Sequence, residues 1–284
     1  MPSASSKRRN EASIARPAPK FALLGCLIVL FIGGTVSGTA QPTFRAPVAN
    51  PFEGRVSMIV QPGPKNLRLD IGHRFYLGST GDSASWRLEY DTEFFTLTRL
   101  RSDGNFKFPV EMIDYWFGVG ATWTSAETPL HARLRIAHIS SHLVDGYASA
   151  SGVFDRRLPF VYSREFVEVL AGYQWGAIRP YAAVTAVWAS QPAQFDRVIP
   201  QLGIDAAWSL GPLLEGIGGY DMRLIGINGV YRPSHAAQVG IRYRSTANAA
   251  ATTLSLFRFD GRSVHAMVAD TYDHYWGIGL QVHL

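Results

Sequence analysis

The chain has 284 residues, with 27 Lys and Arg against 22 Asp and Glu, and a single cysteine, Cys26. Residues 1–40 hold five of the basic side chains, one of the acidic ones and Cys26, so the remainder is almost neutral, with 22 basic against 21 acidic side chains. The basic balance of the whole chain therefore gives no reason to expect a nucleic-acid partner. Beyond residue 40 the sequence has no thiol for a disulfide, a nucleophile or a metal ligand.

The first 40 residues predict a signal peptide. Basic residues from Lys7 to Lys20 precede an uncharged apolar run from Phe21 to Gly34. This run is shorter than the roughly 18 residues that a membrane-spanning helix needs. Gly38-Thr39-Ala40 is a small-x-small cleavage site, and we place the cut after Ala40. The alternative is a retained N-terminal anchor.

Residues 41–284 form one predicted domain of short segments in which apolar and polar residues alternate. About ten alternating residues per strand, separated by turns, are typical of a bacterial outer-membrane β-barrel. We predict an all-β, transmembrane antiparallel β-barrel of about 12 strands, an even number as in such barrels. The expected strands are 53–61, 67–78, 85–100, 111–125, 130–142, 163–176, 178–190, 198–210, 213–225, 235–245, 249–260 and 272–284.

Long and short connections between these strands mostly alternate. The longer ones are 143–162, 191–197, 226–234 and 261–271, and the short ones are 126–129, Ala177, 211–212 and 246–248. Outer-membrane barrels have short periplasmic turns and longer extracellular loops. We therefore expect both chain ends on the periplasmic side and a multi-pass barrel in the outer membrane.

Alternation also assigns faces, because successive side chains of a strand point to opposite sides. A charged row in the third strand must look into a polar lumen, because hydrocarbon would be very costly for it. That row is Arg87, Glu89, Asp91, Glu93 and Arg99. The last strand is expected to point Trp276, Ile278, Leu280, Val282 and Leu284 outward. This alternating end resembles the assembly signal of outer-membrane barrels, which implies the barrel-assembly machinery as a partner.

The most informative stretch is His138-Ile139-Ser140-Ser141-His142, at the predicted extracellular end of strand 130–142. His138 and Ser140 lie two residues apart and share a face that is expected to meet lipid, whereas Ser141 is expected to face the lumen. A base beside a hydroxyl, both facing a bilayer, suggests chemistry on lipids.

Glu165, near the start of strand 163–176, shares a face with Val167 and Val169 and is therefore also expected outward. The two strands are antiparallel neighbours, so the end of one lies beside the start of the other. Glu165 is thus expected to meet His138 and Ser140, to orient the imidazole, and to let His138 accept the Ser140 proton.

His138-x-Ser140 resembles the His-x-Ser element of outer-membrane phospholipase A and of the lipid A deacylase. In both families a strand-borne His and Ser face the membrane, and a third polar residue comes from the adjoining strand. The resemblance implies a serine-type acyl hydrolase of outer-membrane lipids, with His138 as base, Ser140 as nucleophile and Glu165 as orienting acid. Those families usually have an Asn after the serine, where this chain has Ser141.

Several further motifs resemble the signature of a bacterial "domain of unknown function" family (twelve-oh-seven) of signal-bearing proteins. This resemblance covers most of the chain after residue 40, and it implies the fold without an activity. The motifs are Phe108-Pro109-Val110, Asp114-Tyr115, Arg133-Leu134-Arg135, His138 to Leu143 with Asp145, Ser163-Arg164-Glu165, Gly261-Arg262-Ser263 and Gly277-x-Gly279-Leu280.

Arg156 and Arg157, in the longest loop, and His142 are candidate substrate-binding residues. Guanidinium groups pair well with phosphates, such as those of lipid A or of a phospholipid; the alternative is a solvated loop. No cofactor is required by the sequence. By analogy with calcium-dependent lipid hydrolases, a calcium ion held by Asp145, Asp155 and Glu165 is an option.

Two alternatives stay open at this point. The fold alternative is a soluble lipocalin-like barrel or a β-sandwich. The functional alternative is a non-catalytic barrel, either a narrow pore or a structural protein whose lumen charges pair and close it. His-x-Ser is a short pattern, and polar residues at the extracellular end of a strand also occur at the headgroup level of a membrane. The sequence leaves the oligomeric state and the lipid open.

Overall fold

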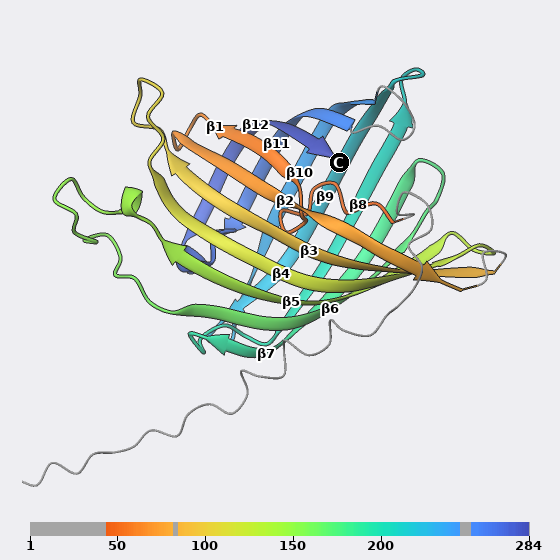
Figure 1. The fold of residues 1–284 in the computed structure, drawn as a ribbon, viewed down its shortest axis with the longest axis horizontal. Coiled ribbons are helices and arrows are strands. Elements are labelled where there is room, and N and C mark those ends of the chain that lie inside the picture. The colour runs from red at the N-terminus through yellow and green to blue at the C-terminus, as the bar shows by residue number, and fades with distance from the viewer. Residues whose placement is uncertain (1–43, 82–84, 245–250, 284) are drawn as a thin grey trace, which may run out of the picture. The chain divides into compact units, whose positions relative to one another are not determined.

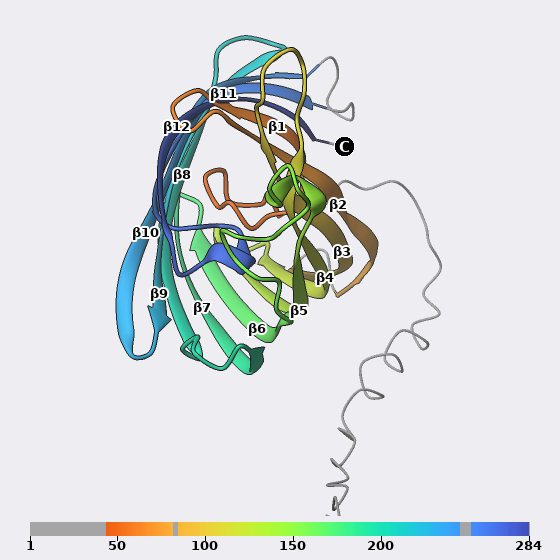
Figure 2. The same ribbon diagram turned by 90° about the vertical axis from the view of Figure 1, so that its left-hand side faces the viewer.

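The computed structural model of the chain describes residues 44–81, 85–244 and 251–283. The predicted signal peptide, 1–40, and Leu284 lie outside the described residues. Twelve antiparallel strands close into a single barrel within the described part of the chain (Figures 1 and 2). They are β1 (Val56–Gln61), β2 (Asn66–Thr80), β3 (Trp86–Arg101), β4 (Val110–Ser125), β5 (Leu130–Leu143), β6 (Tyr162–Tyr173), β7 (Ile178–Gln191), β8 (Val198–Ser209), β9 (Leu214–Ile227), β10 (Val230–Arg244), β11 (Ala251–Arg262) and β12 (Tyr272–His283).

Every strand pairs with its neighbour in the chain, and β1 closes the barrel by pairing with β12. The predicted twelve-stranded antiparallel barrel is therefore confirmed. Short 3-10 helices, η1 (Asp145–Tyr147) and η2 (Ala266–Val268), lie in the β5–β6 and β11–β12 connections. No helix among the described residues is long and apolar enough to cross a membrane.

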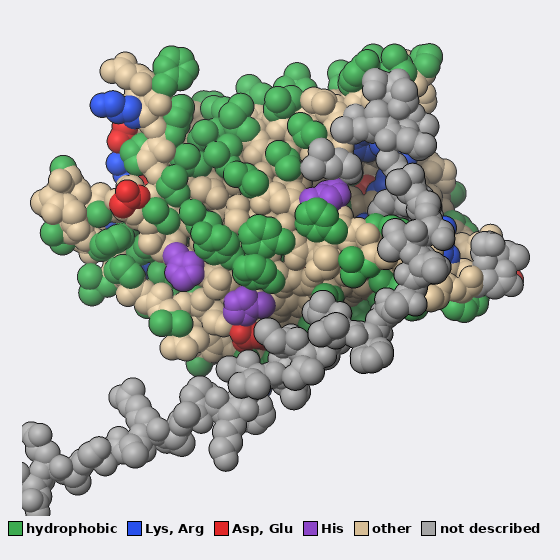
Figure 3. Space-filling model, in the orientation of Figure 1, with side chains coloured by type: hydrophobic (Ala, Val, Ile, Leu, Met, Phe, Trp, Pro, Cys, Tyr) green, Lys and Arg blue, Asp and Glu red, His purple; other side chains and the backbone are tan. Residues whose placement is uncertain are grey.

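The outer face is largely apolar, as the alternating pattern predicts. Leu134 and Ile136 of β5 are exposed on it, while Arg133 and Arg135, between and beside them, are buried inside the barrel. Hydrophobic side chains are spread widely over the face seen in Figure 3. Trp276, Ile278 and Leu280 of β12 are likewise exposed, so the predicted outward row is confirmed for these three residues.

The lumen is polar, and the predicted charged row of β3 faces it. Glu89, Asp91 and Glu93 are all buried. Arg87 pairs with Glu89 at 3.0 Å, and Glu93 contacts Arg135 of β5 at 3.5 Å. Charges inside the barrel thus offset one another, which limits the cost of their burial.

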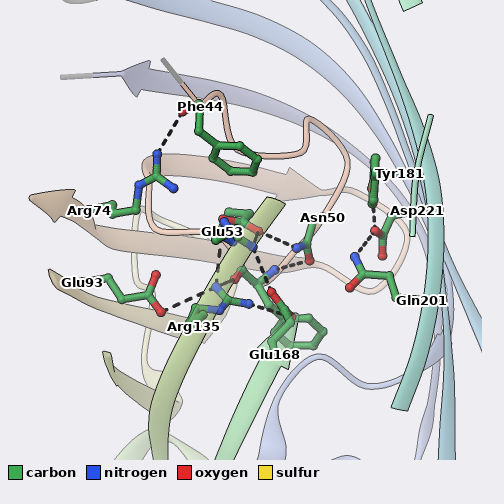
Figure 4. A network of polar contacts seen from close by, with 12 residues as sticks. Phe44, Asn50, Glu53, Arg74, Glu93, Arg135, Glu168, Tyr181, Gln201 and Asp221 are labelled. Atoms are coloured by element: carbon green, nitrogen blue, oxygen red, sulfur yellow. Dashed lines mark hydrogen bonds and ion pairs between the residues drawn. The ribbon is translucent and has the colours of Figure 1, made fainter. Parts of the chain in front are cut away.

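A segment before the first strand enters the barrel and fills the middle of its lumen. We call residues 44–55 the lumenal segment. Arg133 donates to both carboxylate oxygens of Glu53, at 2.8 and 2.7 Å, and to Glu168 of β6 at 2.9 Å. Arg135 donates to Glu168 at 2.9 Å (Figure 4) and to the carbonyl of Phe52 at 3.0 Å. The sequence interpretation placed 53–61 in a strand, whereas β1 begins only at Val56.

One predicted loop is wrong. The 226–234 connection is a two-residue turn, because β9 continues to Ile227 and β10 starts at Val230. Asn228 and Gly229 have φ angles of 52° and 76°. Positive φ at both central residues matches the right-handed twist of a hairpin, and Asn-Gly adopts it at low cost. The regular alternation of long and short connections therefore breaks here.

The longest connection, 144–161, shares one end of the barrel with connections 102–109 and 263–271. We call this the loop end. It is the end predicted to be extracellular, and β5 reaches it at His138 to Leu143.

Candidate functional site

Near the loop end, the neighbouring strands β5 and β6 bring four polar side chains together on the outer face. His138 of β5 lies directly opposite Glu165 of β6, and Ser140 lies directly opposite Ser163. Directly opposite residues of an antiparallel pair share a face. The expectation that His138, Ser140 and Glu165 lie together on the lipid-facing side is therefore met by the strand register.

His138 and Glu165 are hydrogen-bonded. His138 Nδ1 lies 2.9 Å from Glu165 Oε1, and the two side chains are 40% and 30% exposed. Because an ionised carboxylate only accepts, Nδ1 carries the hydrogen and Nε2 is left as the acceptor. This is the tautomer that a general base needs, and it places the free nitrogen away from Glu165.

Ser140 stands beside this pair but is not bonded to it. Within the described residues the Ser140 hydroxyl has no hydrogen-bond partner, and it is partly exposed on the same face as His138. Hydrogen bonds between catalytic groups are often absent before substrate binds. The roles of His138, Ser140 and Glu165 stay a prediction.

Ser163 is a site residue to which the sequence analysis gave no role. Its hydroxyl donates to Glu165 Oε1 at 2.8 Å, so the same carboxylate oxygen is held by Ser163 and His138. Ser163 lies two residues before Glu165, which is the same-face spacing that connected Ser140 to His138. That spacing was the available signal.

Two aromatic residues of β4 flank the site. Tyr115 lies opposite Ser140, and Phe117 lies opposite His138 with the two ring centroids 6.2 Å apart. On the other side, the register of β6 against β7 shifts between Glu165 and Phe166. Bulges of this kind re-aim side chains and are common next to active sites. The site therefore lies between an aromatic wall and a strand irregularity.

The other predicted site residues are distributed differently. His142 lies on the same outer face, edge-on to Tyr115 at 5.9 Å between centroids. Arg156 donates to Glu111 at 3.0 Å, and Arg157 donates to Asp270 at 2.8 Å. These contacts fasten loop 144–161 to the barrel and to the β11–β12 connection. Phosphate binding by Arg156 and Arg157 stays a prediction.

The predicted inward direction of Ser141 is confirmed, since it is buried and donates to Asp114 inside the barrel. It therefore has no access to a substrate at the outer face. Asp145 accepts a hydrogen bond from the Gly146 backbone at 2.9 Å. No three His, Cys, Asp or Glu side chains of the described residues group as a metal site requires, so Asp145, Asp155 and Glu165 do not form a calcium cluster.

The fold resembles that of solved outer-membrane barrels. Outer-membrane phospholipase A from Escherichia coli matches with a TM-score of 0.52 and 11% identity, over 86% of this chain and 95% of that chain. The outer membrane phospholipase of Salmonella typhi, a dimer with bound calcium, matches with a TM-score of 0.53 and 11% identity, over 86% and 94% of the two chains. LpxR from Salmonella typhimurium reaches a TM-score of only 0.38 at 13% identity, over 76% and 87% of the chains.

No protein-family model and no curated protein matches the chain. The resemblance to a family of unknown function therefore stays a prediction. The structural matches show the architecture, which is consistent with a multi-pass β-barrel in the outer membrane.

Proposed function

We propose that this protein is an outer-membrane hydrolase of lipid acyl esters, with Ser140, His138 and Glu165 as its catalytic residues. The observation that carries the proposal is the 2.9 Å contact between His138 Nδ1 and Glu165 Oε1 on the outer face. Ser140 is the next residue of β5 on that same face. Charged groups on a lipid-facing surface are costly and usually functional. Here the carboxylate, the imidazole and the hydroxyl have the order that acyl transfer requires.

In the proposed reaction the Ser140 oxygen attacks the ester carbonyl carbon, and His138 Nε2 takes the hydroxyl proton. The tetrahedral intermediate breaks its bond to the alcohol, which leaves with the proton from His138. Water then attacks the acyl-serine ester with His138 as base, releasing the fatty acid and restoring Ser140. Glu165 holds the imidazole in one tautomer throughout.

The substrate class follows from the position of the site. An acyl chain in the outer leaflet reaches Ser140 without leaving the membrane, because the hydroxyl is on the lipid-facing side of β5. Ester-linked chains of a phospholipid and of lipid A both satisfy this geometry. Of the three predicted substrate-binding residues, His142 lies on the same face as Ser140, which makes it the best placed to contact a headgroup.

The functional alternative is a non-catalytic barrel. Its pore version is disfavoured by the lumenal segment, in which Glu53 and Asn50 are buried among the inner side chains. Its structural version gives no role to the four polar side chains on the outer face, His138, Ser140, Ser163 and Glu165.

Fatty-acid release by the purified full-length barrel tests the proposal. Phospholipid vesicles and purified lipopolysaccharide are the two substrates, and wild type is compared with Ser140→Ala and His138→Ala. We expect both variants to lose about a thousandfold or more of the activity, as for other serine hydrolases. Thr252→Ala, which removes an exposed hydroxyl on β11, is the matched control and keeps full activity. Undiminished fatty-acid release by Ser140→Ala would show that Ser140 is not the nucleophile.

A further inference from the structure

A polar cavity lies inside the loop end of the barrel, away from the outer-face site. Its volume is about 280 Å³. Its polar lining comes from Gln61 of β1, Asn66 of β2, Arg99 of β3, His265 in the β11–β12 connection, and Tyr272, Asp273 and His274 of β12. We call it the mouth cavity. Ligand pockets of proteins begin at about 300 Å³, so this space suits one small molecule.

Several groups that line the mouth cavity have no partner in the protein. Within the described residues, no hydrogen bond or ion pair engages the side chain of Gln61, Asn66 or Asp273. Gln61 is nonetheless buried. Buried or half-buried polar groups without partners are unfavourable unless water or a ligand satisfies them.

His265, which lines this cavity, has its tautomer fixed by a hydrogen bond. Its Nδ1 lies 2.9 Å from Asp114 Oδ2 and donates to it, which leaves Nε2 without a hydrogen. Asp114 is fixed in turn by the hydroxyl of Ser141 and, at 3.0 Å, by the backbone N–H of Ala266. The buried imidazole is therefore held by Asp114, which is itself fixed by two further hydrogen bonds.

The charges of the lining narrow the ligand class. Arg99 contacts Glu111 through Nε at 3.1 Å, and its terminal nitrogens make no side-chain hydrogen bond within the described residues. A phosphate would be repelled by the Asp273 carboxylate, and a cation would be repelled by the Arg99 guanidinium. An uncharged ligand with several hydroxyl groups avoids both conflicts, since each hydroxyl donates to a carboxylate or an imidazole and accepts from an amide or a guanidinium.

We propose that the mouth cavity binds one hexose ring, with Asp273, His265, Gln61 and Arg99 hydrogen-bonded to its hydroxyl groups. Tyr275, whose ring stacks on Phe259, is the mostly buried aromatic residue of the cavity wall and the apolar group against which the sugar would pack. The ligand is either a free monosaccharide or a sugar residue of a glycolipid. The site does not depend on hydrolysis at Ser140.

Saturation-transfer NMR on the purified full-length barrel tests this proposal. The detergent must be free of sugar, such as a zwitterionic amine oxide, because a maltoside would compete. The probes are D-glucose, D-galactose and D-mannose, with inorganic phosphate and choline as charged comparisons. We expect transfer to at least one hexose, and a loss of about tenfold in affinity for Asp273→Asn and for Gln61→Leu, in line with the loss of one or two hydrogen bonds. Thr252→Ala leaves binding unchanged.

Thermal unfolding of the same variants separates a binding role from a structural one. Because Asp273 has no partner, Asp273→Asn is expected to leave the melting temperature unchanged or to raise it while binding is lost. A lower melting temperature would show that the carboxylate stabilises the fold and would overturn the assignment. So would the absence of transfer to all three hexoses, equal binding by the variants, or a preference for phosphate or choline.

Purified lipopolysaccharide distinguishes the two sources of the sugar. Displacement of the bound hexose by lipopolysaccharide would identify a glycolipid residue as the ligand. Retention of the hexose would identify a free monosaccharide.

Discussion

Replacing Glu53 is expected to destabilise the barrel strongly, although Glu53 lies in no strand. Its carboxylate accepts two hydrogen bonds from Arg133, at 2.8 and 2.7 Å, and one from Asn50 at 2.7 Å. Arg133 is 1% exposed, so it cannot turn to water when Glu53 is removed. Arg133 would then keep only the carboxylate of Glu168, which also pairs with Arg135 and Arg223.

The expected cost of Glu53→Ala is about 3–5 kcal/mol, the range for breaking a buried ion pair by removing one partner. Arg45→Ala is the matched control, because Arg45 lies in the same segment and its contact with Glu215 is exposed. An exposed pair contributes at most about 1 kcal/mol. In the double variant Glu53→Leu with Arg133→Met, the unpaired charge is gone, so most of the lost stability should return.

Urea unfolding of the barrel in lipid vesicles, followed by tryptophan fluorescence, measures these differences. A cost for Glu53→Ala no larger than that for Arg45→Ala would refute the reasoning. It would mean that the lumenal segment is not held by Arg133 in the membrane. Planar-bilayer recordings on the same variants then report directly whether the segment leaves the lumen.

Three further predictions concern the site, the corrected hairpin and the loop. Ser163→Ala removes one of the two bonds to the Glu165 carboxylate, so lipid hydrolysis should fall up to about tenfold while Ser163→Thr retains it; equal rates for both variants would exclude a positioning role. Gly229→Ala should destabilise the barrel by about 1 kcal/mol in urea unfolding because φ there is 76°, and an unchanged midpoint would contradict the turn geometry. Asp270→Asn weakens the hold on Arg157, so trypsin should cleave loop 144–161 a few-fold faster on the folded protein; the same cleavage rate would show that this contact does not restrain the loop.

The strands and their faces could be predicted because each strand carries its own signal. Apolar side chains that meet lipid and polar side chains that meet the lumen alternate with a period of two, so Leu134 and Ile136 separate from Arg133 and Arg135 within one short stretch. The Asn228-Gly229 hairpin was also signalled by its turn residues. Loop-length alternation predicts a longer connection here, whereas the two positive-φ positions of Asn228 and Gly229 close the hairpin in two residues.

The site was predictable only in part. Parity placed His138, Ser140 and Glu165 on one face, and the length of loop 144–161 did not affect the pairing of β5 with β6. The same spacing of two residues places Ser163 on the face of Glu165, but parity alone does not say that the Ser163 hydroxyl bonds to the carboxylate oxygen that also holds His138. The lumenal segment was missed for a different reason. It has no periodicity of its own, and its partner Arg133 lies 80 residues away from Glu53.

That separation has a consequence for how the barrel is assembled. The lumenal segment is joined directly to β1, and β1 must pair with β12, the last strand of the chain, before the cylinder is complete. Contacts between residues far apart in sequence form late and slowly, because the loops that they close are long. The lumenal segment and β1 are continuous in the chain, so the pairing of β1 with β12 and the burial of Glu53 are expected to occur together. Insertion into the membrane is expected to end in a single cooperative step, and a bulky fusion placed just before Phe44 should slow this step more than the same fusion in loop 144–161.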